Sequence, residues 1–199
     1  MSGRQSKILS NTQQRFVLSH IENSRHPIRN KLIFLLSFKS GLRAKEIAEL
    51  DWSSITNAEG DISENITVYN DQSKGGYSGR SIPMAKAIYT VLIEYKALLE
   101  SEGRSTEPKD KIIFSERGNR LSAHSIVNLF RRWYQKLGLN GCSSHSGRRT
   151  FITHCSKKIG SVGGSLRDVQ QLVGHSNLNT TQRYIEFDKD CTKKLIDMI

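Results

Sequence analysis

The spacing of apolar residues is the feature that most constrains the fold. Between residues 85 and 99 apolar positions recur at intervals of three and four, which places them on one face of an α-helix. They are Ile88, Val91, Leu92, Tyr95 and Leu99. The same reasoning predicts further helices over 11–21, from Pro27 to Gly41, over 44–50 and 122–137, from 144 or 145 onward, and over 166–174.

One stretch departs from helical spacing. ITVY at 66–69 is β-branched and aromatic, RSIPM at 80–84 can return as a second strand, and SKGGYSG at 73–79 supplies turn glycines between them. A third short strand, IIF, is expected at 112–114. We therefore predict one domain over residues 1–199, mainly α with a small antiparallel β-sheet, an α+β fold.

Ends and faces of the helices can also be predicted. Asn11 is the expected cap of the first helix, Gly41 a left-handed turn after the second, and Ser122 the cap of the helix over 122–137. The expected core positions of the first helix and of the helix over 122–137 are Phe16, Val17, Ile21, Ile126, Leu129, Phe130, Trp133 and Leu137.

The charge of the chain narrows the class of partner. Its 199 residues carry a formal net charge of +11, with a sequence pI near 9.7. Basic domains of this size usually face polyanions, and nucleic acid is the first candidate. The alternative is a basic surface that only keeps the protein in solution.

The cysteines and the lack of long apolar runs indicate where the protein works. Cys142, Cys155 and Cys191 are odd in number and lack the spacing of a disulfide framework, which indicates a reducing cytoplasm. No apolar run approaches the length of a membrane span, and MSGRQSKILS has no signal region. We expect no membrane association. A zinc site is disfavoured as well, because adjacent His154 and Cys155 point about 100° apart on a helix.

HSGRR at 145–149 is the first motif with chemical content. His145 and Arg148 lie three residues apart at an expected helix start, where free N–H groups and the helix dipole favour an anion. Without other motifs, His145 is as well explained as a helix cap and Arg148 as a surface base.

Two further basic residues are weak signals on their own. Arg43 follows the helix-ending Gly41 at the mouth of the next helix, and Lys74 lies at the tip of the expected hairpin. Either can be a solvated turn residue.

HSNLNTTQRY at 175–184 separates an imidazole from a phenol by nine positions, with mostly polar residues between them. A core segment would repeat apolar residues, and this one does not. Tyr184 is therefore either a surface aromatic or a reactive group.

Taken in order, these motifs resemble those of the tyrosine recombinase (phage integrase) family. LVGHSNLNTTQRYIEF at 172–187 is similar to the last motif of that family, and the resemblance spans residues 11–199. Two departures stand out. Gly147 occupies a position where leucine is commoner, and the residues before Arg43 leave no room for the helical DNA-clamping domain. The chain thus resembles a catalytic domain alone, similar in size to the short recombinases that invert fimbrial promoters.

The resemblance implies a role for each motif residue. Arg43 and Arg148 would bind the scissile phosphate, Lys74 would protonate the leaving oxygen, and Tyr184 would be the nucleophile. His145 would assist as a base and His175 would hydrogen-bond the phosphate. Planar guanidinium groups suit phosphate oxygens and stabilise charge in the transition state, so we expect no cofactor and no metal.

The resemblance also implies the partners. They are double-stranded DNA, three further copies of the chain on paired DNA sites, and an accessory DNA-binding protein if one supplies the missing clamp. The tail at 185–199 would dock on a neighbouring protomer, although packing on its own domain is an equal alternative. The protein would be bacterial or phage-encoded, cytoplasmic and associated with the nucleoid. Two other functions stay open: DNA binding without strand transfer, and a type IB-like topoisomerase.

Overall fold

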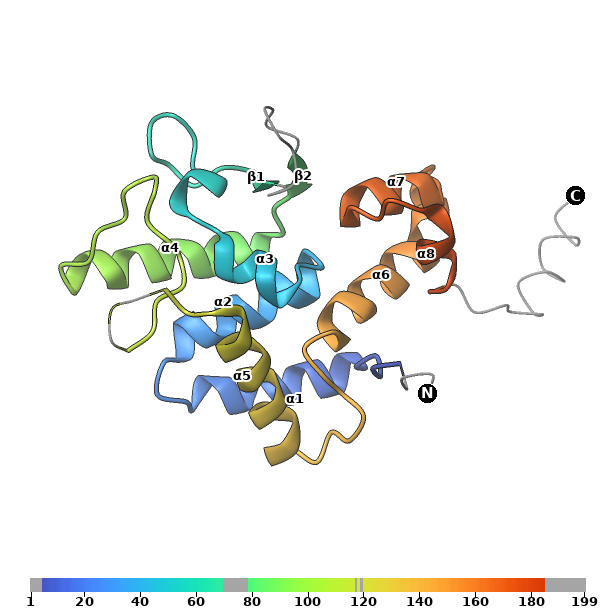
Figure 1. The fold of residues 1–199 in the computed structure, drawn as a ribbon, viewed down its shortest axis with the longest axis horizontal. Coiled ribbons are helices and arrows are strands. Elements are labelled where there is room, and N and C mark those ends of the chain that lie inside the picture. Colours follow the sequence, from blue (N-terminus) through green and yellow to red (C-terminus); the bar gives the residue numbers. More distant parts are fainter. Residues whose placement is uncertain (1–4, 70–78, 117, 119, 185–199) are drawn as a thin grey trace, which may run out of the picture. The chain divides into compact units, whose positions relative to one another are not determined.

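The computed structural model describes residues 5–69, 79–116, 118 and 120–184. Most of these residues are helical, and the sheet among them is a two-stranded antiparallel hairpin (Figure 1). The predicted fold class, mainly α with a small antiparallel sheet, is confirmed. None of the described helices is long and apolar enough to cross a membrane.

The chain packs as two compact units, residues 1–151 and 152–199, and each is described by itself. The prediction of a single domain over 1–199 stays a prediction. The tail at 185–199 lies outside the described residues.

Helix α1 (Asn11–Glu22) of the first unit covers the predicted range 11–21, but its cap is a different residue. Ser10, not Asn11, is the cap: its hydroxyl accepts from the Gln13 N–H at 3.2 Å, and the Gln13 side chain accepts from the Ser10 N–H at 2.9 Å. Phe16 is 54% exposed, so its predicted core position is wrong. Buried Val17 points about 100° away from it around the helix.

Helix α2 (Pro27–Lys39) has proline at its first position, where the missing N–H removes no helical bond. Gly41 has a φ of +66°, which confirms the predicted left-handed turn. Arg43 then occupies the cap position of helix α3 (Ala44–Glu49). A short 3-10 helix, η1 (Trp52–Ser54), follows.

The predicted hairpin is present as β1 (Asn65–Tyr69) and β2 (Gly79–Pro83). Ile66 pairs with Ile82, and both are buried. The connection at 70–78, which contains Lys74, lies outside the described residues.

The strand predicted at 112–114 does not form. Ile112 and Ile113 are buried, but the chain makes only single bridges on either side, at Asp51 with Lys111 and at Phe114 with Arg120. The apolar run is explained by burial without a strand ladder.

Two long helices complete the core of the first unit. Helix α4 (Lys86–Ser101) buries all five predicted residues and packs beside α2 (Figure 1). Helix α5 (Ala123–Lys136) is capped by Ser122 as predicted, through the Ser125 N–H at 3.1 Å. Its buried residues are Ile126, Phe130, Trp133 and Tyr134. The first three were predicted and Tyr134 was not, whereas Leu129 and Leu137, also predicted as core, are only partly buried.

Helix α6 (Ser146–Lys158) crosses the boundary between the units. In the second unit, a short 3-10 helix, η2 (Ile159–Val162), follows α6. Helix α7 (Leu166–Val173) ends at Gly174, with a φ of +66°, as predicted. Helix α8 (Leu178–Gln182) packs against α7 and was not predicted.

Candidate active site

Arg43 is held where helix α3 begins. Glu46, in the first turn, accepts from the Arg43 backbone N–H at 2.7 Å through Oε2 and from the Arg43 side chain at 3.0 Å through Oε1. A carboxylate at this position satisfies a free N–H group and complements the helix dipole. The same residue therefore fixes the backbone and the guanidinium of Arg43.

Arg148 joins this group from the first turn of α6. Its Nη1 donates to the Gly41 carbonyl oxygen at 2.7 Å and lies 3.8 Å from Glu46 Oε2. The side chain is only 6% exposed. A buried guanidinium must be matched by oxygen atoms, and here the Gly41 carbonyl and the Glu46 carboxylate provide them.

Gly147 lets α6 approach α2 closely. A Cβ there would contact the Ser37 hydroxyl and lie 2.8 Å from Ser37 Cβ and 2.9 Å from the Phe38 ring. A leucine, which is commoner at this position in the family that the sequence resembles, has no space. The first departure from the motif thus has a packing explanation.

The start of α6 is also tied to the N-terminal segment. The Leu9 N–H donates to Thr150 Oγ1 at 3.0 Å, and Arg149 donates to the Ser6 carbonyl at 2.9 Å. These bonds join residues more than 140 positions apart and fix the turn that carries Arg148.

Arg80 is a third arginine that the sequence analysis did not single out. It lies on β2, with Nη2 2.9 Å from Glu46 Oε1 and a side chain that is 13% exposed. Arg43, Arg80 and Arg148 therefore surround Glu46, and we call these four residues the arginine cluster. Its formal charge is +2, which suits a phosphate diester.

The charge state of Glu46 follows from its surroundings. Burial raises the pKa of this carboxyl, but the Arg43 backbone hydrogen bond and the charges of Arg80, Arg148 and Arg43 together hold it below 4.5. Glu46 is therefore an anion at neutral pH, and the cluster keeps a net positive charge.

His145 lies one residue before α6. Its carbonyl accepts the first helical bond from the Arg149 N–H at 2.9 Å, so His145 stands at the cap position, and its side chain is exposed. Lys74 lies outside the described residues, so its predicted role stays a prediction.

His175 is fixed by α7 and α8 in the second unit. Its ring Nδ1 lies 2.9 Å from Thr181 Oγ1, and its backbone N–H and carbonyl both bond Gln170, at 3.1 and 2.9 Å. Only 9% of His175 is exposed. The two bonds to Gln170 fix the backbone of His175, and the Thr181 hydroxyl orients its ring.

Tyr184 lies just beyond α8, and its backbone N–H donates to the Thr181 carbonyl at 3.1 Å. Its ring stacks on that of His175, with centroids 6.0 Å apart and planes inclined by 23°. The polar connection between His175 and Tyr184 is thus a short helix that brings the phenol beside the imidazole.

The structure accordingly gathers the described site residues into two groups. Arg43 and Arg148 belong to the arginine cluster, and His175 and Tyr184 form a stacked pair within the second unit. Sequence reasoning missed Glu46, Arg80 and Thr181. Glu46 carries a recognisable signal, because it follows the helix start at the position of a capping carboxylate; Arg80 carries none.

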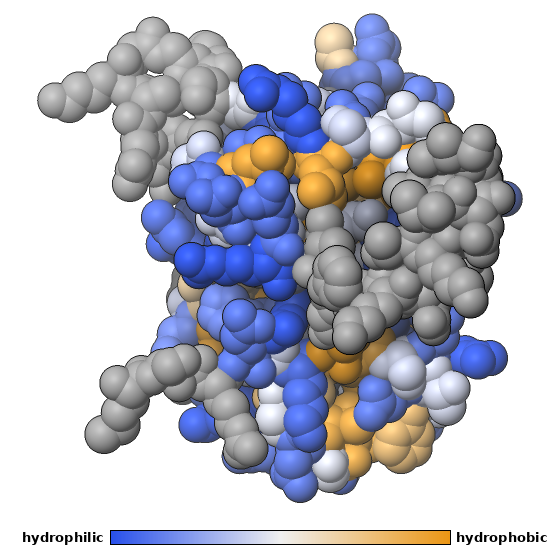
Figure 2. Space-filling view, turned by 90° about the vertical axis from the view of Figure 1, so that its right-hand side faces the viewer, coloured by the Kyte–Doolittle hydropathy of each residue, from blue (hydrophilic) through white to orange (hydrophobic). Residues whose placement is uncertain are grey.

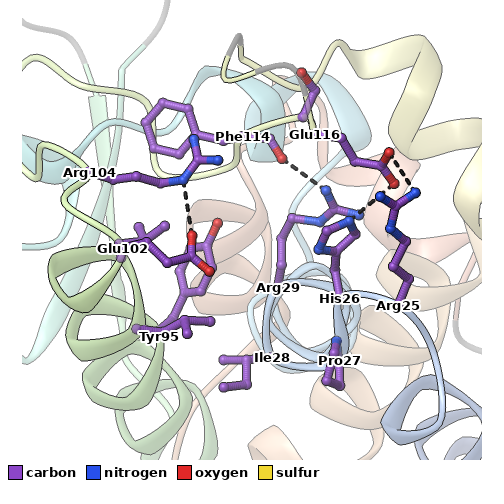
Figure 3. A pocket seen from close by; sticks show the side chains of 13 residues that line it. Arg25, His26, Pro27, Ile28, Arg29, Tyr95, Glu102, Arg104, Phe114 and Glu116 are labelled. Atoms are coloured by element: carbon purple, nitrogen blue, oxygen red, sulfur yellow. Dashed lines mark hydrogen bonds and ion pairs between the residues drawn. The ribbon is translucent and has the colours of Figure 1, made fainter.

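A separate cavity of about 480 Å³ lies between the ends of α2 and α4 in the first unit (Figure 3). Its polar groups contact one another: Arg25 and His26 contact Glu116 at 2.8 and 3.1 Å, Arg104 contacts Glu102 at 3.1 Å, and Arg29 donates to the Phe114 carbonyl at 3.0 Å. None of the predicted site residues that the structure describes lines it.

The described residues hold no cluster of three His, Cys, Asp or Glu side chains that would suit a metal ion. Cys142 and Cys155 are free thiols, and burial raises the pKa of both. Cys191 lies outside the described residues. On the face drawn in Figure 2, hydrophilic residues predominate and hydrophobic ones form separate patches.

Known proteins show where this chain belongs. The sequence model of the phage integrase family matches residues 7–190. The tyrosine recombinase XerC of Yersinia pestis is 32% identical over 163 residues, which cover 81% of this chain and 48% of the relative. XerC of Haemophilus influenzae strain PittEE is 34% identical over 170 residues, which cover 81% of this chain and 51% of the relative.

Solved structures agree on the fold. The XerA recombinase superposes with a TM-score of 0.72 at 23% identity, covering 98% of this chain and 65% of that one. The XerH site-specific recombinase bound to a difH substrate gives 0.73 at 21% identity, covering 98% and 55%. The chain spans about half the length of the curated relatives it matches. The match over residues 7–190 shows that it belongs to the phage integrase family, that of the tyrosine recombinases.

Proposed function

We propose that the protein is a site-specific DNA recombinase that cuts and rejoins DNA strands through a 3′-phosphotyrosine at Tyr184. The observation that carries this proposal is the arginine cluster, in which two motif arginines meet around one largely buried carboxylate. A net positive charge in a partly buried setting stabilises the charge that develops on a phosphate during transfer.

The proposed reaction uses the roles that the family motifs imply for these residues. The Tyr184 phenol oxygen attacks the scissile phosphorus, a bond from tyrosine oxygen to phosphorus forms, and the bond to the 5′ oxygen breaks. His145 accepts the phenol proton, and Lys74 donates a proton to the leaving oxygen. Arg43, Arg148 and His175 hold the phosphate oxygens. A 5′ hydroxyl of another strand then reverses the step and releases Tyr184, so the phosphodiester is restored without ATP.

The partners belong to the same proposal. Double-stranded DNA is the substrate, and exchange between two sites requires four copies of the chain, one for each strand that is cut. An accessory protein that grips DNA is a further proposed partner, and the proposed location is the cytoplasm, at the nucleoid. The Tn1549 transposon integrase, a structural neighbour, was solved in complex with a circular intermediate DNA, which supports DNA as the substrate class.

The test is a covalent trap. Nicked duplexes tiled across the DNA that flanks the gene are mixed with the wild type, Tyr184→Phe or Tyr89→Phe, and each reaction is stopped with detergent. Tyr89 is an exposed tyrosine on α4 and is the control for the loss of one phenol. We expect an adduct with the wild type and Tyr89→Phe, and none with Tyr184→Phe.

Two other results would each indicate a different function. Tight, salt-sensitive binding without any adduct would indicate DNA binding without strand transfer. Relaxation of supercoiled plasmids that carry no paired sites would indicate a topoisomerase.

A further inference from the structure

We propose that Arg80 is a positioning residue that retains the Glu46 carboxylate, so that Arg43 can leave it for the substrate phosphate. This inference rests on the proposed strand transfer and adds a residue outside the six motif residues. It concerns contacts within the first unit only.

Arg80 is placed as a fixed counter-charge. It lies opposite Val68 in the hairpin register, its side chain is 13% exposed, and its Nη2 is 2.9 Å from Glu46 Oε1. The buried Nε and Nη2 atoms make no hydrogen bond, so the contact with Glu46 is an ion pair without hydrogen-bond geometry. A buried guanidinium in this setting depends on the neighbouring carboxylate for its stability.

Arg43 shares the same oxygen from a different environment. Its Nη1 is 3.0 Å from Glu46 Oε1, but its side chain is 43% exposed. Water screens an exposed ion pair and weakens it, whereas a buried pair persists. Of the two guanidinium groups on Oε1, that of Arg43 is therefore the easier to withdraw.

Because Arg43 and Arg80 both contact Glu46 Oε1, Arg80 can affect how Arg43 binds the substrate. When a phosphate diester arrives, Arg43 can exchange a carboxylate for a phosphate while Arg80 keeps Glu46 paired. Without Arg80, Arg43 would be the closest remaining side-chain partner of Glu46 among the described residues, since Arg148 lies at 3.8 Å. A buried carboxylate that loses its partner is strongly destabilised, so Glu46 would then compete with DNA for Arg43.

This competition makes a prediction that a merely structural ion pair does not. Arg80→Gln should slow adduct formation, and adding Glu46→Gln should restore it, because a neutral amide no longer retains Arg43. Glutamine keeps an oxygen for the Arg43 backbone N–H, so the start of α3 is preserved. If Arg80 only tied the hairpin to α3, Glu46→Gln would break the same tie and rescue nothing.

The experiment measures the rate of adduct formation on one nicked duplex for the wild type, both single variants and the double variant. We expect Arg80→Gln to be about tenfold slower than the wild type, and the double variant to be within about threefold of Glu46→Gln alone. Arg120→Gln with Glu49→Gln is the matched control: it breaks an exposed pair with contacts of 2.9 Å to the same helix, and its rate should not change. Thermal melting of each variant checks that it is folded.

Each result decides a different question. A folded Arg80→Gln protein with the wild-type rate overturns the inference and leaves the proposed function intact, as does a double variant no faster than Arg80→Gln. If Arg80→Gln does not fold, folded Arg80→Lys replaces it: the single charge of lysine should retain most of the rate, and a rate as low as that of Tyr184→Phe would overturn the inference. If the wild type forms no adduct on any duplex, the proposed function and the inference fall together.

Discussion

The guanidinium of Arg148 donates to the backbone carbonyl of Gly41 at 2.7 Å, although 107 positions separate the two residues. Gly41 has a left-handed backbone conformation and lies in the turn between α2 and α3. Helix α3 begins directly after Arg43, its cap residue. One turn thus positions both motif arginines: Arg43 through the direction of the chain, and Arg148 through a hydrogen bond.

Gly41→Ala should therefore destabilise the protein more than the same substitution does at an ordinary left-handed turn. Its φ of +66° disfavours a side chain, and a Cβ would lie 2.5 Å from the Phe151 ring. Gly138 has the same φ with no atom within 4 Å, so Gly138→Ala measures the backbone effect alone. We expect Gly138→Ala to lower the free energy of unfolding by about 1 kcal/mol and Gly41→Ala by about 1–3 kcal/mol more. Urea unfolding measures both, and equal losses would contradict the packing role of Gly41.

Gly147→Ala should also destabilise the protein, against ordinary helix propensity. Alanine is favoured over glycine within a helix by about 1 kcal/mol. At Gly147, however, the added Cβ would contact Ser37 and the Phe38 ring in α2. We expect a net loss of about 1–3 kcal/mol from overpacking. Gly160→Ala, where a Cβ meets nothing within 4 Å, is the control, and a stabilised Gly147→Ala protein would show that α6 has room to move.

Glu46 should make stability depend on pH on the acid side. Its pKa in the folded protein is below 4.5. As the pH falls through that range, the folded protein therefore binds fewer protons than the unfolded chain. The stabilisation is present above pH 4.5 and is lost as the pH falls through the folded pKa. Glu46→Gln should therefore flatten the acid limb of stability against pH, measured by urea unfolding from pH about 7 down to about 3. Glu94→Gln, at an exposed position of α4, controls for the loss of one carboxylate, and a Glu46→Gln curve parallel to the wild type would contradict the role of the cluster.

Thr181→Val should loosen the histidine that lies beside Tyr184. Thr181 is fully buried, and its hydroxyl lies 2.9 Å from His175 Nδ1. Valine keeps the shape and removes the hydroxyl, so we expect a loss of about 1–2 kcal/mol in stability and about tenfold in the rate of adduct formation. Exposed Thr180→Val should change neither quantity. A Thr181→Val protein with the wild-type rate would show that His175 is oriented by its other contacts.

The sequence predicted those parts of the fold that depend on local chemistry. The helical face of α4, the turns at Gly41 and Gly174 and the cap at Ser122 all follow from spacing or from backbone preference, and all are present. Each depends on residues that are near one another in the chain.

The parts that could not be predicted depend on distant contacts. Helix α8 was missed because its local stabilisation is polar: the Asn177 side chain accepts from the Asn179 N–H at 2.8 Å, and a threonine, Thr181, fills the core position. Arg80 was missed because nothing near it in the sequence indicates that its strand meets Glu46. Residues 112–114 were predicted as a strand because burial and strand pairing favour the same apolar residues.

The most direct test of the account is to locate the covalent bond. The detergent-stable adduct would be digested with protease and nuclease, and the peptide that retains a nucleotide would be sequenced by mass spectrometry. Strand transfer by Tyr184 predicts a single modified residue, Tyr184, bearing a 3′-linked phosphate. A nucleotide on any other tyrosine, or an adduct that persists in Tyr184→Phe, would contradict it.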